Sequence, residues 1–204
     1  ADPEQTTLTM MNTAAGKSYN ELCERHKADY TNLFNRVKLT LNPHAPMTLQ
    51  YPAITDLPTY QRLARYRKGN PDYKLEEIYY QFGRYLLIAS SRPGNLPANL
   101  QGMWANGVDG PWHVDYHNNI NIQMNYWPVC STNLGECAWP LIDFIRTLVK
   151  PGEKTARAYF GARGWTASIS GNIFGFTSPL TDEDMSWNFN PMAGPWLATH
   201  IWDY

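Results

Sequence analysis

The sequence predicts an all-α fold, a barrel or bundle of helices whose connecting loops are long and aromatic. Residues 73–91 carry apolar side chains at helical spacing, and residues 134–149 show a second such face. Two stretches without a clear period, 101–128 and 164–191, hold aromatic residues in place of charge. Loops longer than about 12–15 residues are uncommon unless they are functional, so these stretches are where we look for a site.

Start and stop signals predict the remaining helices. Ser18 and Glu21 form a capping-box pair ahead of a helical pattern that should run to about residue 36. A short basic helix is expected over residues 59–68. Pro151 suits the first turn of another helix, which Gly161 should end. A last apolar helix begins near residue 193.

The chain is expected to have two parts. Residues 42–58 hold four prolines and no clear period, which is typical of a connector that runs over a surface. We therefore expect a linker helix and connector over residues 1–58 and a helical domain over residues 59–204. The chain stops at Tyr204 within an apolar helical pattern, so we expect residues beyond this chain to complete the domain.

Composition excludes several classes of function. Only 17% of the 204 residues are charged and the formal net charge is −1, which leaves no basic surface for nucleic acid. Nothing approaches the ~18 consecutive apolar residues of a membrane span. The three cysteines (Cys23, Cys130 and Cys137) match no zinc spacing and are interpreted as buried or free thiols. We expect no cofactor.

The stretch 101–128 combines three tryptophans, two histidines and a run of asparagines with almost no charge. Buried amides must find hydrogen-bond partners or cost about 1–3 kcal/mol each. A segment rich in both amides and flat apolar rings suits a pocket for a polar, uncharged ligand with apolar faces. A sugar is such a ligand.

Known catalytic motifs are mostly missing from the sequence. It contains no G-x-S-x-G elbow, no P-loop and no G-x-G-x-x-G. His113 and His117 have the H-x-x-x-H spacing, but Val114 stands where a zinc protease has glutamate. With Asp115 nearby a metal site is an alternative, although the sequence shows no further ligands, and we predict none.

Glycoside hydrolysis usually needs two carboxyl groups on either side of the scissile bond. The acidic residues in aromatic surroundings are Asp109, Asp115 and the run Asp182, Glu183 and Asp184. Such a run is more typical of a solvated loop. Asp115 lies between Val114 and Tyr116, but it supplies only one half of a catalytic pair.

Asn119 and Asn121 are the sharper feature. Residues at i and i+2 point the same way on an extended segment and diverge on a helix, so two convergent amides need an extended piece or a helix entrance. An amide oxygen is too weak a base to take a proton from water unaided and would need a carboxylate behind it. The alternative is that Asn119 caps a short helix and Asn121 bonds the backbone.

Several long blocks in the chain are similar to the α-L-fucosidases of glycoside hydrolase family 95. The blocks are RYLLIASSRPG at residues 84–94, LPANLQG at 96–102, DYH at 115–117, NINIQMNYWP at 119–128, GARGW at 161–165 and GPW at 194–196. The resemblance implies an inverting hydrolase with an (α/α)6 barrel, of which this chain would hold roughly the first half. It also implies fucosylated oligosaccharides as substrate, chemistry without a metal and an extracytoplasmic (periplasmic or secreted) location.

Individual residues take roles from this resemblance. Asn119 and Asn121 resemble the asparagine pair that holds the attacking water, with Asn121 nearer to acting as base. His117 resembles the histidine whose face packs on the C6 methyl of fucose. Trp196 resembles a tryptophan of the same pocket, and Trp104 or Trp112 would line its wall or entrance.

The chain also departs from the family pattern. The general-acid glutamate and the aspartate that activates the asparagine lie further along than residue 204, and the N-terminal β-sandwich domain is missing. The remainder of the barrel is therefore an expected partner. Three other functions stay open: an α-L-galactosidase on the same scaffold, a non-catalytic carbohydrate-binding fragment that stacks sugars on tryptophan, and a plain helical scaffold.

Overall fold

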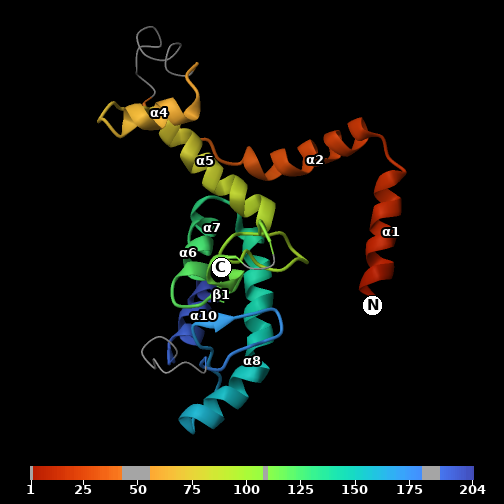
Figure 1. Cartoon of the computed structure of the whole chain (residues 1–204), viewed down its shortest axis with the longest axis vertical. Coiled ribbons are helices and arrows are strands. Elements are labelled where there is room, and N and C mark those ends of the chain that lie inside the picture. The colour runs from red at the N-terminus through yellow and green to blue at the C-terminus, as the bar shows by residue number, and fades with distance from the viewer. Residues whose placement is uncertain (1, 43–55, 108–109, 181–188) are drawn as a thin grey trace. The chain divides into compact units, whose positions relative to one another are not determined.

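A computed structural model describes residues 2–42, 56–107, 110–180 and 189–204. It has two compact units, Ala1–Lys38 and Leu39–Tyr204. The structure is mostly helical, which confirms the all-α prediction (Figure 1). Most of the predicted connector, residues 43–55, lies outside the described residues. Among the described helices, none is long and apolar enough to cross a membrane.

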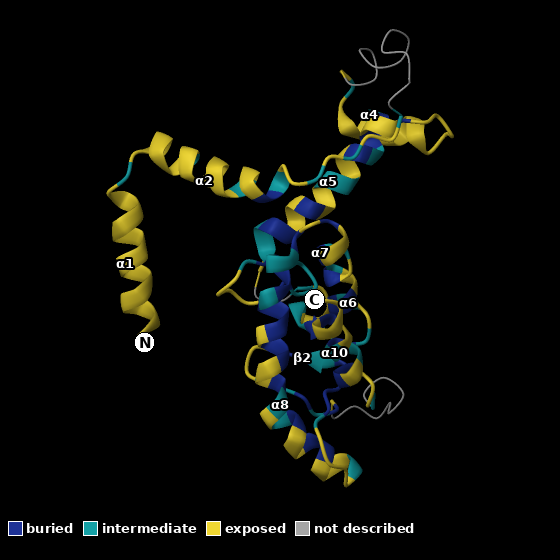
Figure 2. Ribbon diagram, turned by 180° about the vertical axis from the view of Figure 1, so that it is seen from behind, coloured by how far each residue is buried: buried dark blue, intermediate teal, exposed yellow. Residues whose placement is uncertain are grey.

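The first unit consists of α1 (Pro3–Ala15) and α2 (Tyr19–Phe34). Ser18 Oγ accepts a hydrogen bond from the Glu21 N–H at 3.2 Å, so the capping prediction for α2 is confirmed. Helix α1 was not predicted. The Asp2 side chain caps it through the Glu4 N–H, and its residues are exposed throughout, so it has no apolar stripe by which the sequence could reveal it (Figure 2).

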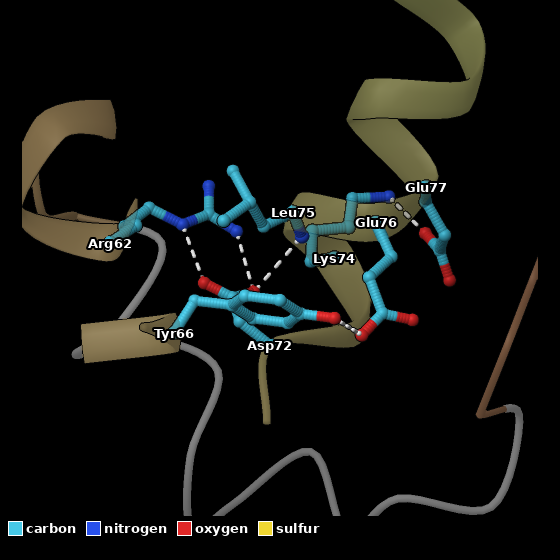
Figure 3. Close-up of polar contacts among 7 residues, drawn as sticks. All are labelled: Arg62, Tyr66, Asp72, Lys74, Leu75, Glu76 and Glu77. Carbon is cyan, nitrogen blue, oxygen red and sulfur yellow. Dashed lines mark hydrogen bonds and ion pairs between the residues drawn. The ribbon is translucent and has the colours of Figure 1, made fainter. Parts of the chain in front are cut away.

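In the second unit, α4 (Thr59–Tyr66) and α5 (Tyr73–Ser90) are joined by a buried ion pair (Figure 3). Arg62 Nε and Nη2 donate to the two carboxylate oxygens of Asp72 at 2.9 and 2.8 Å. Asp72 Oδ1 also accepts the Leu75 N–H and so caps α5. The hydrogen bonds from Arg62 are the main cause that holds the pKa of Asp72 below its usual range.

Helix α5 is confirmed, but most of its apolar face is not buried. Leu75 is 8% exposed, whereas the other large apolar side chains of the predicted face are 37–79% exposed: Ile78, Tyr79, Phe82, Tyr85 and Leu86. The buried positions of α5 include Arg84 and Glu77 instead. Exposed apolar stripes of this length usually mark an interaction surface.

The core of the second unit lies along α8 (Trp139–Phe160). Helix α10 (Ala193–Asp203) packs against α8 and against α6 (Asn121–Tyr126), and the short α7 (Pro128–Ser131) follows α6 (Figure 1). The predicted face of α8, Leu141, Phe144, Ile145 and Leu148, is buried as expected. The turn η2 (Gly135–Ala138) precedes α8, so the helix begins five residues later than the pattern suggested.

The prediction that Pro151 begins a new helix is wrong, because Pro151 lies inside α8. Proline in a helix interior removes one hydrogen bond and costs about 3 kcal/mol. Here buried residues on both sides, among them Leu148, Thr155 and Ala156, hold the chain helical across it. Gly161 ends the helix in the left-handed conformation (φ 58°), as predicted.

Gly152 in α8 makes a close backbone contact that predicts a stability effect. A Cβ at this position would lie 2.5 Å from the carbonyl oxygen of Thr166, whose N–H donates to the Gly152 carbonyl at 3.2 Å. Gly152→Ala must therefore push two backbone segments apart. We expect urea denaturation to show a loss of about 1–3 kcal/mol in the free energy of unfolding.

Gly83→Ala is the matched control, since Gly83 is an exposed helical glycine in α5 with no atom within 4 Å of the added Cβ. This variant should gain up to about 1 kcal/mol from helix propensity. The two substitutions are thus expected to have opposite signs. A Gly152→Ala variant as stable as wild type would show that the approach of α8 to residue 166 is not close.

Candidate functional site

The buried phenol of Tyr126, in α6, bonds to the segment that follows α5, at Ser91 and Ala98. Its hydroxyl is 2.7 Å from Ser91 Oγ and accepts the Ala98 N–H at 2.8 Å, while Ser91 Oγ donates to the Cys137 carbonyl at 2.9 Å. With one proton on each hydroxyl, Tyr126 must donate to Ser91. Burial raises the pKa of Tyr126, so the phenol keeps this proton.

The two-residue strand β1 (Tyr116–His117) leads into the site. It pairs antiparallel with β2 (Ser170–Gly171), which places Tyr116 opposite Gly171 and His117 opposite Ser170. The Tyr116 ring packs on Phe144 of α8 with centroids 4.5 Å apart, and its hydroxyl donates to the Pro97 carbonyl. Burial raises the pKa of Tyr116 to about 12. The sequence did not indicate this strand pair, since two residues are too few to show a period.

His117 contacts two residues that the sequence singled out as candidates, Asp115 and Trp112. Its Nδ1 contacts Oδ1 of Asp115, and both side chains are 14% exposed. The Trp112 ring meets the imidazole edge-on, with centroids 5.7 Å apart and an interplanar angle of 74°. The structure thus brings His117, Asp115 and Trp112 together.

Trp112 is in the turn η1 (Pro111–Val114), whose backbone is strained. Trp112, His113 and Val114 have φ of 58°, 58° and 53°, in the left-handed region that costs roughly 1–2 kcal/mol per residue. Trp112 itself is 66% exposed. A strained turn that presents an exposed aromatic ring is a feature often found at ligand sites.

The other two predicted tryptophans lie on different elements. Trp104 packs on Gly102, where an added Cβ would meet its ring at 2.6 Å, and its centroid is 6.5 Å from that of Tyr85 in α5. Trp196 is half-buried on α10, the helix that packs against α6. Among the ring contacts of the described residues, neither tryptophan meets His117.

Asn119 and Asn121 lie at a helix entrance, one of the two arrangements that convergent amides require. Asn119 is in the turn after β1 and Asn121 is the first residue of α6. Ile120, and not Asn119, is the N-cap, and within the described residues no side chain caps this helix. The capping alternative for Asn119 is therefore not observed. Asn119 Oδ1 is buried and has no hydrogen-bond partner in the part of the chain that the structure describes.

Two further amides, Asn118 and Gln123, surround this pair and were not singled out from the sequence. Both are fully buried, and Gln123 Nε2 donates to the Asn118 carbonyl at 2.7 Å. Asn118 Nδ2 donates to the Ser168 carbonyl at 3.0 Å. Asn118 Oδ1 and Gln123 Oε1, like Asn119 Oδ1, have no partner among the described residues. The signal in the sequence that could have identified Asn118 and Gln123 is the run of amide residues within an apolar segment.

The structure gives less support to the other candidate residues. Asp109 and the run from Asp182 to Asp184 lie outside the described residues. His113 is exposed, and among described residues no three side chains of histidine, cysteine, aspartate or glutamate come together as metal ligands.

The site combines an exposed aromatic ring, an imidazole in contact with a carboxylate, and buried amides. These features are typical of one class of site, which binds a neutral polar ligand with apolar faces. Comparison with known proteins narrows this class. A profile of the glycosyl hydrolase family 95 catalytic domain matches residues 18–204. The chain therefore belongs to glycoside hydrolase family 95, as its motifs predicted.

Three named relatives are similar over most or all of the chain. Alpha-L-fucosidase 2 of Arabidopsis thaliana is 40% identical over 203 residues, which are 100% of this chain and 24% of that protein. Probable alpha-fucosidase A of Aspergillus niger is 37% identical, with 100% and 25% covered, and its namesake in Aspergillus oryzae is 35% identical, with 95% and 25% covered. The chain thus spans about a quarter of the length of these relatives.

Proposed function

We propose that the chain forms the water-binding side of the active site of an inverting α-L-fucosidase. In this proposal the complete enzyme removes terminal α-linked L-fucose from oligosaccharides. The single observation that supports it best is Asn119 Oδ1, a buried acceptor without a partner among the described residues, at the entrance of α6 and two residues after His117. The names of the three relatives support the substrate class.

Asn119 and Asn121 are proposed to hold the attacking water, with Asn121 nearer to the role of base. An amide can orient water but needs a carboxylate to draw its proton away. We propose that this aspartate and the general-acid glutamate come from the remainder of an (α/α)6 barrel. The exposed apolar face of α5, with Tyr79 79% and Phe82 51% exposed, supports a partner of that kind. An extracytoplasmic location remains part of the same proposal.

The stereochemistry of the product tests the proposal. We expect proton NMR of the complete enzyme with an aryl α-L-fucoside to show β-L-fucose as the first product, before mutarotation. Release of the α-anomer would overturn the inverting mechanism. Absence of any hydrolysis would overturn the fucosidase activity.

His117 is proposed to select the deoxysugar, because its ring is held by Asp115 and flanked by Trp112. His117→Thr removes an apolar face from the C6 methyl group. A single methyl or methylene contact is worth about 1–3 kcal/mol, so the fucoside/galactoside ratio of kcat/KM should fall by about 10–200-fold.

The matched control is His26→Thr, an exposed histidine of α2, which should leave the ratio unchanged. An unchanged ratio in His117→Thr would discard the methyl-packing role. A wild-type preference for the L-galactoside would instead favour the α-L-galactosidase alternative.

A carbohydrate-binding role without catalysis is the second candidate, favoured by the exposure of Trp112 (66%) and Trp104 (44%). Titration of the complete protein with L-fucose, followed by tryptophan fluorescence, together with an assay of fucoside hydrolysis distinguishes the two. Saturable binding by a complete protein that shows no turnover would favour the second candidate.

A further inference from the structure

Asp115 is the acidic side chain that holds His117 at the candidate site, and the proposed function gives it no further role. Its Oδ1 contacts His117 Nδ1, and only 14% of each side chain is exposed. Water therefore competes poorly for either group. This pair is far less exposed than the surface pair of Asp143 with Arg146, whose side chains are 57% and 64% exposed.

The backbone conformation places the side chains of Asp115 and His117 next to each other. Asp115 and His117 are two residues apart on extended chain, so their side chains lie on the same side while Tyr116 between them points into the core against Phe144. The Asp115 carbonyl accepts the Leu100 N–H at 3.3 Å, and β1 pairs with β2. These backbone bonds keep residues 115–117 extended, so the Cβ atoms of Asp115 and His117 stay on the same side of the chain.

The contact with Asp115 determines which nitrogen of the His117 imidazole carries the proton. An ionised carboxylate can only accept a hydrogen bond, so the His117 nitrogen that faces it, Nδ1, must carry a proton. In a neutral imidazole the other nitrogen, Nε2, then has a free lone pair and can only accept.

We propose that Asp115 is a positioning residue for sugar recognition. By holding the Nδ1–H tautomer of His117, it presents Nε2 as an acceptor for a sugar hydroxyl and keeps the ring face available to an apolar group. The inference rests on the proposed function for the identity of the ligand. The tautomer itself can be measured without a ligand.

Nitrogen-15 NMR of the histidine side chains tests the tautomer. At mildly alkaline pH, the protonated and the unprotonated ring nitrogens of an imidazole have well-separated shifts. The chain has five histidines, and His117→Gln identifies the signal by its loss. We expect wild-type His117 to carry its proton on Nδ1. A proton on Nε2 would overturn the proposal, whatever the enzyme does.

Asp115→Leu removes the acceptor and should release His117 to the Nε2–H tautomer, whereas Asp143→Leu, at an exposed carboxylate of α8, should not. In the complete enzyme, loss of a side chain that orients a binding histidine should lower kcat/KM for an α-L-fucoside roughly 10–100-fold. If Asp115→Leu does not fold, the wild-type spectrum alone decides the inference. Wild-type enzyme without activity would overturn the proposed function and leave the tautomer result standing.

Discussion

Asn121→Ala in the complete enzyme is expected to lower kcat by about 10²–10⁴-fold with little change in KM. Asn121 is the first residue of α6, directly after the turn that holds Asn119. In the proposed mechanism its amide contacts the attacking water and not the sugar. An interaction needed mainly in the transition state lowers kcat and kcat/KM together when it is removed.

Steady-state kinetics with an aryl α-L-fucoside provide the measurement. Asn119→Ala should behave similarly, because the two amides act on one water molecule and their losses should not add. The control is Asn20→Ala, an exposed asparagine of α2, which should match wild type. A kcat for Asn121→Ala within about tenfold of wild type would contradict the water-holding role.

Arg62→Met is expected to destabilise the chain by about 3–5 kcal/mol at neutral pH. The substitution leaves the Asp72 carboxylate, 8% exposed, without the two hydrogen bonds that Arg62 donates. A buried charge without its partner keeps its desolvation cost and loses the attraction that offsets it. The helix cap on α5 depends on the same carboxylate.

The effect of this substitution should depend on pH in a defined direction. The folded-state pKa of Asp72 lies below its unfolded value, so the pair contributes its full stability above the unfolded pKa of about 3.9 and loses it as pH falls through the folded pKa. The difference between Arg62→Met and wild type should be full at pH ~7 and shrink below pH ~4.

Urea denaturation across this pH range provides the measurement, with Arg146→Met as the control. Arg146 pairs with Asp143 on the surface, where ion pairs contribute about 0–1 kcal/mol. Equal losses for Arg62→Met and Arg146→Met, or a difference that does not change with pH, would contradict the account of the Arg62–Asp72 pair.

Local signals in the sequence predicted the elements whose causes are local. Ser18 caps α2, Gly161 ends α8 and the apolar face of α8 is buried, because capping, left-handed glycine and helical spacing act within a few residues. Pro151 was misinterpreted because packing of α8 outweighs a local preference. The face of α5 shows the reverse, a strong local pattern that the described residues leave largely exposed.

The site was predictable in part. The amide run and the tryptophans pointed to residues 101–128, and the structure joins Trp112, His117 and Asp115 there. Asn118 and Gln123 were not predicted, because Asn118 bonds to the Ser168 carbonyl, fifty residues further along, and Gln123 bonds in turn to the Asn118 carbonyl. The hydrogen bond between Tyr126 and Ser91 likewise joins residues that are far apart in the sequence, so no local spacing predicts it.

A crystal structure of the complete enzyme with L-fucose bound is the most direct test of the central claim. The account predicts one ordered water within hydrogen-bond distance of both Asn119 and Asn121, next to the anomeric carbon, with the C6 methyl against the His117 ring. Two amides turned away from each other and from the sugar, each bonded to the main chain, would contradict it.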